Sequence, residues 1–155
     1  MKFHSPMIIV SDITKSKKFY IDILNQEITQ DLGVYAVLGS FSMMTREQWN
    51  AFTNDVPFSS VKTGHTFELY FEEDNLDDFV QELDKNAVIQ KFTALEEMPW
   101  GQRTIRFLDP DKYVIEVAES MESVIKRFLL AGMTVQEISQ KTMMPIEFIQ
   151  NCKAK

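Results

Sequence analysis

The alternation of apolar and polar residues along the chain predicts two copies of one structural unit. In the first copy, the apolar run at 3–10 predicts a strand, and Ile13, Tyr20 and Leu24 share one face of a predicted helix that Ser11 or Asp12 can cap. Three short segments rich in β-forming residues follow at 27–32, 34–39 and 40–44. Residues 1–55 therefore predict the order βαβββ.

The same order returns after a stretch of polar and turn residues at 45–64, which predicts a connector. A strand predicted at 66–71 leads to a helix capped by Asp74 or Asn75, with an apolar stripe through Leu76 and Leu83. Three strands are then predicted at 88–92, 102–108 and 113–118, with a turn at 109–112. The second copy spans residues 62–118, so the chain repeats its structural order.

Residues 119–155 lie beyond this repeat and predict three helices. The first ends at Gly132, Thr134 and Glu137 form a capping box for the second, and Pro145 opens the third. The last two have the spacing of a helix-turn-helix, but the third begins with Ile146, Glu147 and Phe148, where DNA-reading helices usually carry basic and amide side chains. We expect this tail to pack on the rest of the protein or across a dimer, burying Phe128, Leu129, Ile138, Phe148 and Ile149.

Composition narrows the class of protein. The 155 residues are 45% hydrophobic, which is enough for a substantial core, and carry a net charge of -7, which argues against nucleic acid and anionic membranes as partners. Cys152 is the single cysteine, so no intrachain disulfide is expected. The N-terminus has no signal-peptide pattern, and no segment has the apolar length of a membrane span. We therefore expect a cytoplasmic protein with no membrane partner.

Two stretches carry a resemblance to a known family. PWGQRTIRFLDPDKYVIEVAE at 99–119 and VSDITKSKKFYIDILN at 10–25 resemble parts of the vicinal-oxygen-chelate superfamily, which includes glyoxalase I, ring-cleaving dioxygenases, and fosfomycin- and bleomycin-resistance proteins. The resemblance implies an α+β fold in which paired βαβββ modules form a half-open barrel over residues 1–118, and it implies a homodimer. The superfamily usually has DPDG in its last turn, whereas Lys112 stands here, where a left-handed residue other than glycine costs roughly 1 kcal/mol.

The resemblance also implies where active members bind a metal ion, on the first and last strand of each module. Glu68 and Glu116 match these positions in the second module, and their carboxylates suit a divalent cation such as Zn, Ni, Mn or Fe. The first module offers Ser5, with His4 one residue away on the opposite face, and then Ser42, Met43 and Met44. Since a catalytic site usually needs three protein ligands, we expect an incomplete site that His4 or His65 completes if either turns inward.

Without a metal ion, two carboxylates in one cavity repel each other, so one pKa rises. Glu68 or Glu116 then acts as a general base or binds a cationic ligand, unless Arg103 or Arg106 neutralises them. Besides these glutamates, the candidate ligand-binding residues are Ser5, Met7, Met43, Tyr70, Trp100 and Arg103.

Three functions stay open from the sequence. The first is binding of a small molecule in an apolar cavity edged by Glu68 and Glu116. The second is a metal-dependent lyase, transferase or dioxygenase in which the same two residues are catalytic. The third is a ligand-responsive regulator whose tail binds DNA.

Overall fold

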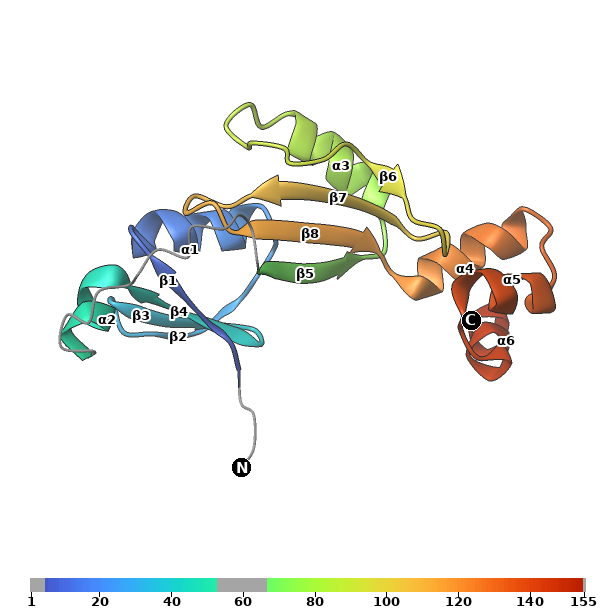
Figure 1. Ribbon diagram of the computed structural model, residues 1–155, viewed down its shortest axis with the longest axis horizontal. Coiled ribbons are helices and arrows are strands. Elements are labelled where there is room, and N and C mark those ends of the chain that lie inside the picture. Colours follow the sequence, from blue (N-terminus) through green and yellow to red (C-terminus); the bar gives the residue numbers. More distant parts are fainter. Residues whose placement is uncertain (1–4, 53–66, 155) are drawn as a thin grey trace. The chain divides into compact units, whose positions relative to one another are not determined.

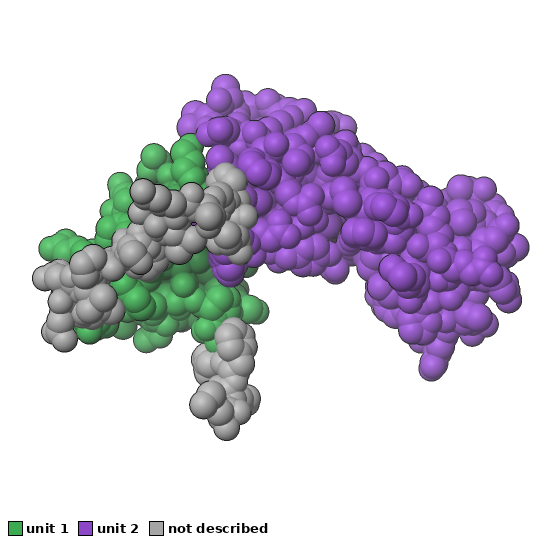
Figure 2. All heavy atoms as spheres, viewed as in Figure 1, with its two compact units in different colours: residues 1–66, 109–112 green, residues 67–108, 113–155 purple. Residues whose placement is uncertain are grey.

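The computed structural model describes residues 5–52 and 67–154, and the chain divides into two compact units (Figure 2). Unit 1 comprises residues 1–66 and 109–112, and unit 2 comprises residues 67–108 and 113–155. Each unit contains one open four-stranded sheet, and three helices end the chain (Figure 1). The predicted α+β class and the repeated order of the two modules are confirmed.

Unit 1 follows the predicted order closely. Its elements are β1 (Met7–Val10), α1 (Ile13–Asp22), β2 (Ile28–Asp31), β3 (Tyr35–Leu38), β4 (Phe41–Thr45) and α2 (Arg46–Phe52). The strand order is β1-β4-β3-β2, with β1 parallel to β4 and the other neighbours antiparallel. Asp12 caps α1 by accepting a hydrogen bond from the Lys15 backbone N–H.

The core of unit 1 lies between α1 and one face of its sheet. Tyr20 of α1 is fully buried, and its ring centroid lies 5.1 Å from that of Phe41 on β4. The same sheet face carries the buried residues Ile8, Val10, Ala36, Leu38 and Met43. Met7 belongs to the other face, because side chains alternate along a strand and Met43 is paired with Ile8.

The turn at 109–112 is held against α1. Tyr20 donates a hydrogen bond to the buried carboxylate of Asp109 (2.9 Å), and Asp111 accepts from the Ser11 backbone N–H (2.9 Å) and the Ser16 hydroxyl (3.2 Å). The two acidic residues of the turn are therefore structural, because they fix the start and the buried face of α1.

Lys112 closes this turn in the left-handed region, with a φ of 71°. Glycine at position 112 should stabilise the protein by about 0.5 kcal/mol, because relief of the left-handed strain outweighs the extra entropy of the unfolded chain. Urea denaturation of Lys112→Gly measures the gain. Asn25→Gly is the matched control: its φ is 49°, and asparagine already tolerates this region, so no gain is expected there. A lower urea midpoint for Lys112→Gly would contradict the prediction.

One helix was absent from the sequence prediction. α2 occupies the start of the stretch predicted as a connector, while the rest of that stretch lies outside the described residues. Thr45 caps the helix by accepting a hydrogen bond from the Gln48 backbone N–H (3.2 Å), and Glu47 lies in the first turn. The Thr-x-x-Gln spacing is the local signal for this helix.

Unit 2 contains β5 (Glu68–Glu73), α3 (Leu76–Asp84), β6 (Glu96–Glu97), β7 (Arg103–Leu108) and β8 (Val114–Glu119). Its strand order is β5-β8-β7-β6, with β5 parallel to β8. α3 covers one face of this sheet, where Phe79 contacts the ring of Phe107 at a centroid distance of 6.2 Å. Leu69, Leu76, Leu83, Ile105, Ile115 and Val117 are buried there.

The strand predicted at 88–92 is wrong. Only Lys91 forms a β-bridge, to Phe107, and the first strand after α3 is β6. The segment follows β7 through two backbone hydrogen bonds, Phe92 N–H to Arg106 O (2.8 Å) and Leu108 N–H to Gln90 O (3.0 Å). Val88 is almost fully exposed, so the strand-favouring side chain at this position is not packed against any neighbour as it would be in a sheet.

Three helices form the tail, α4 (Met121–Leu130), α5 (Val135–Thr142) and α6 (Ile146–Ala154). The predicted capping box is present, and Gly132 follows α4 with a φ of 85°. Their common core contains Val124, Ile125, Phe128, Ile138, Ile149 and Cys152, with Leu129 and Phe148 packed against it. No helix within the described ranges is long and apolar enough to cross a membrane.

Candidate functional site

We call the face of the second sheet opposite α3 the polar face. Its centre is a row across three adjacent strands, since Tyr70 on β5 is paired with Glu116 on β8, and Glu116 is paired with Arg106 on β7. Side-chain alternation adds Glu68 to the same face. Three neighbouring strands thus bring acidic, basic and phenolic groups together on one surface.

Arg106 bridges the two carboxylates. Its Nε lies 3.2 Å from Glu68 Oε2, and its Nη2 lies 2.7 Å from Glu116 Oε2. The hydroxyl of Thr104, itself buried, donates to Glu116 Oε1 at 2.8 Å. Glu116 is therefore held on both oxygens in a buried position, whereas the Glu68 side chain remains 43% exposed.

Burial raises the pKa of Glu116, and the neighbouring Glu68 carboxyl raises it further through a hydrogen bond and its negative charge. The Thr104 hydroxyl and the Arg106 charge act in the opposite direction without reversing the shift. Glu116 accordingly takes up a proton at a higher pH than an ordinary glutamate.

Tyr70 is placed by a second set of hydrogen bonds. Its hydroxyl donates to Glu72 Oε1 (3.0 Å) and accepts from Gln102 Nε2 (2.9 Å). Burial, together with the nearby carboxylates of Glu72 and Glu116, raises the pKa of Tyr70 to about 12. Tyr70 is therefore a neutral phenol near pH 7, and 49% of the residue is exposed at the polar face.

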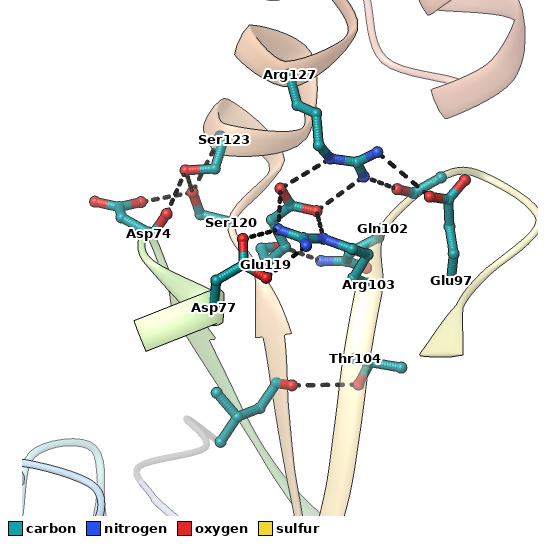
Figure 3. A network of polar contacts seen from close by, with 12 residues as sticks. Asp74, Asp77, Glu97, Gln102, Arg103, Thr104, Glu119, Ser120, Ser123 and Arg127 are labelled. Atoms are coloured by element: carbon teal, nitrogen blue, oxygen red, sulfur yellow. Dashed lines mark hydrogen bonds and ion pairs between the residues drawn. The ribbon is translucent and has the colours of Figure 1, made fainter. Parts of the chain in front are cut away.

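A separate ionic cluster lies at the end of β8, on the side of the sheet that α3 covers (Figure 3). The Glu119 side chain, only 3% exposed, accepts from Arg103 Nε (3.2 Å) and from Arg127 Nη2 (2.9 Å). Arg103 also pairs with Asp77 at the start of α3 (2.8 Å), and Arg127 pairs with Glu97 (3.3 Å). Although burial opposes it, the Arg127 and Arg103 guanidiniums hold the pKa of Glu119 below its usual value. This cluster joins the sheet, α3 and the tail.

The structure brings some of the predicted site residues together. Glu68, Glu116 and Tyr70 share the polar face, and Trp100 is linked to it, because Trp100 Nε1 donates to Gln102 Oε1 (2.9 Å). Arg103 lies on the opposite face, in the ionic cluster with Glu119 and Asp77.

The remaining candidates belong to unit 1 or lie outside the described residues. Ser5 precedes β1 and is half-buried, Met7 is partly exposed, and Met43 is buried on the face that α1 covers. His4 and His65 are outside the described ranges. The ligand-binding roles of these residues stay predictions.

Two residues of the polar face were not named as candidates from the sequence. Gln102 and Thr104 precede Arg106 at intervals of two, which places all three on one side of the β7 segment. The sequence signal for Gln102 and Thr104 is the same alternation that relates Glu68 to Tyr70. Placing these two residues on the polar face also requires the register of β7 on β8, which the sequence does not contain.

The polar face does not fit a divalent metal ion as its side chains lie. Residues 5–52 and 67–154 contain no group of three or more histidine, cysteine, aspartate or glutamate side chains that could hold one. Glu68 and Glu116 supply oxygen ligands, but the Arg106 guanidinium already contacts both, so the two carboxylates cannot close around one divalent ion without losing that bridge.

The chain matches the model of one protein family. A family model described as a glyoxalase-like domain matches residues 3–122. None of the curated proteins matches the chain.

Several solved structures are similar to this chain. A protein of unknown function from Agrobacterium tumefaciens str. C58 is 31% identical, with 78% of this chain and 95% of that chain covered and a TM-score of 0.69. A glyoxalase/bleomycin resistance protein/dioxygenase family enzyme from Burkholderia phytofirmans PsJN is 18% identical (76% and 98% covered, TM-score 0.64). Lactoylglutathione lyase from Agrobacterium tumefaciens is 15% identical (75% and 92% covered, TM-score 0.57). The family match ends inside α4, so most of the tail lies beyond it.

Proposed function

Because this chain belongs to the glyoxalase-like domain family, we propose that it binds a small molecule that carries a cationic group, and that the ligand lies on the polar face. The observation that carries the proposal is the row formed by Tyr70, Glu116 and Arg106, with Glu68 beside it. This row offers charged, hydrogen-bonding and aromatic groups at a partly exposed surface, where a ligand can reach Glu68 and Tyr70.

The charge of the polar face favours a cation. Glu68, Glu72 and Glu116 are three carboxyl groups, and Arg106 is the guanidinium that pairs with two of them. Glu68 is the accessible partner, because its side chain is 43% exposed while Glu116 is buried. A ligand ammonium or amidinium group would therefore share the Glu68 carboxylate with Arg106.

Tyr70 favours a ligand with a flat or apolar part next to that cation. The residue is about half exposed, and its hydroxyl is held by Glu72 and Gln102. An aromatic face attracts cations and stacks on other rings, and both interactions are worth about 1 kcal/mol at exposed sites. The alternative of a metal-dependent lyase has less support, since the Arg106 bridge takes the place that an ion would need.

Three probes of similar size test the proposal: benzylamine, benzyl alcohol and benzoate, which are cationic, neutral and anionic at pH 7. Calorimetric titration should give the highest affinity for benzylamine and the lowest for benzoate. Glu68→Gln should weaken benzylamine about fivefold, since a half-exposed charge pair is worth up to about 1 kcal/mol. Glu147→Gln removes the same charge from α6 and should leave the affinity unchanged. Benzoate binding as tightly as benzylamine, or an ineffective Glu68→Gln, would contradict the proposal.

A further inference from the structure

A path of hydrogen bonds runs from the tail to Tyr70. Arg127 of α4 donates from Nη2 to the backbone oxygen of Gly101 at 2.6 Å. The next residue, Gln102, donates from its side-chain nitrogen to the Tyr70 hydroxyl (2.9 Å) and to the Glu119 backbone oxygen (2.8 Å). Gln102 is only 7% exposed, so it stands between the tail and the polar face as a buried link.

Packing fixes the segment that carries this link. Residues 98–102 form a tight turn in which the Gly101 N–H donates to Met98 O (2.7 Å) and the Met98 N–H donates to Gln102 O (2.8 Å). Gly101 lies directly against the tail, because a Cβ on it would be 2.3 Å from Phe128 Cζ and 2.9 Å from Lys141 Cε. The turn is therefore held by α4 and α5 as well as by the sheet.

The two hydrogen-bond partners of the Tyr70 hydroxyl differ in how firmly they are placed. Glu72 is exposed, so its carboxylate is not confined by packing. Gln102 is buried, and Trp100 Nε1 donates to its oxygen at 2.9 Å while its nitrogen serves Tyr70 and Glu119. Both ends of this amide are thus occupied, and Gln102 is the partner that determines where the phenol lies.

We infer that Gln102 is a positioning residue through which the C-terminal tail orients Tyr70 for a ligand on the polar face. This inference rests on the proposed function. It gives a role to a segment that lies largely beyond the family domain, which ends at residue 122. Because coupling between two equilibria is reciprocal, a ligand that fixes Tyr70 also strengthens the docking of the tail.

The first test needs no ligand. In a Trp49→Phe background, Trp100 is the single tryptophan, and its indole reports on Gln102 directly. Arg127→Met removes the hydrogen bond to Gly101 together with the ion pairs to Glu119 and Glu97, and it keeps most of the aliphatic side chain. Acrylamide quenching of Trp100 should rise about twofold, as expected for a turn that opens locally. Arg127→Lys, a milder change, should give a smaller rise. Unchanged quenching in both variants, with the tail still folded by circular dichroism, overturns the inference.

The second test is a double-mutant cycle on benzylamine affinity with Gln102→Leu and Tyr70→Phe. Each single change should weaken binding about fivefold, whereas Gln102→Leu should add little in the Tyr70→Phe background, because it acts through that hydroxyl. If the wild type binds benzylamine but the double mutant loses affinity by the product of the two single losses, Gln102 does not act through Tyr70 and the inference is overturned. If the wild type does not bind benzylamine, the proposed function itself fails, and with it the role assigned to Gln102.

Discussion

Replacing Glu119 with glutamine is expected to destabilise the protein by about 3 kcal/mol at pH 7, the largest loss we expect from a single charge. The carboxylate is nearly inaccessible and accepts hydrogen bonds from both Arg103 and Arg127. A neutral amide would remove the buried carboxylate that the two guanidiniums share, leaving them only the exposed carboxylates of Asp77 and Glu97, and its N–H groups would point at other donors. Urea denaturation at constant ionic strength measures the loss.

The stabilisation that Glu119 provides depends on pH. The pKa of Glu119 is lowered in the folded protein from an ordinary value of 4.5, so its stabilisation is fully present above that value and is lost as the pH falls through the folded pKa. The stabilities of wild type and Glu119→Gln should therefore converge in acid.

Glu116→Gln is the matched control, three residues earlier on the same strand. The pKa of Glu116 is raised, so its ionised form is the disfavoured one in the folded protein, and Glu116→Gln should not destabilise the protein at pH 7. Equal losses from Glu116→Gln and Glu119→Gln would contradict the assignment of the first residue to a binding face and the second to a structural cluster.

Gly101→Ala is expected to cost about 3 kcal/mol, because it combines overpacking with backbone strain. The added methyl group would lie 2.3 Å from Phe128 Cζ and 2.6 Å from Cε2, and the φ of 88° is one that alanine rarely adopts. Relief requires the tail to move away from the turn. Thermal and urea unfolding measure the loss.

Gly132→Ala separates the two causes. Its φ of 85° is nearly the same, but no atom lies within 4 Å of an added Cβ, so only the backbone cost of about 1 kcal/mol is expected. If both substitutions lower the free energy of unfolding equally, the tail does not pack tightly against the turn at Gly101. The packing evidence for a link from Arg127 to Gln102 would then be lost.

Local sequence signals predicted most of the fold, because strand and helix periods are properties of neighbouring residues. The Asp12 cap, the capping box of Thr134 with Glu137 and the left-handed Gly132 follow from short spacings and are all present. The segment at 88–92 shows where such reasoning fails. Its residues favour a strand, but their local propensity does not determine whether a neighbouring strand pairs with the segment.

The candidate site was only partly accessible to the same reasoning. Alternation within β5 placed Glu68 with Tyr70, but choosing between Arg103 and Arg106 as the partner of the glutamates requires the register of β7 on β8. A slip of one residue exchanges the two arginines between faces. Long-range links such as Arg127 to Gly101 leave no local signal at all.

A nitrogen-15 NMR titration of chelator-treated protein with benzylamine shows whether a ligand binds the polar face without a metal ion. We predict that the backbone amides of Tyr70, Arg106 and Glu116 shift in a saturable manner and that added Mg²⁺, Mn²⁺ or Zn²⁺ is not required. Shifts that avoid these three residues, or binding that appears only when a divalent ion is supplied, would contradict it.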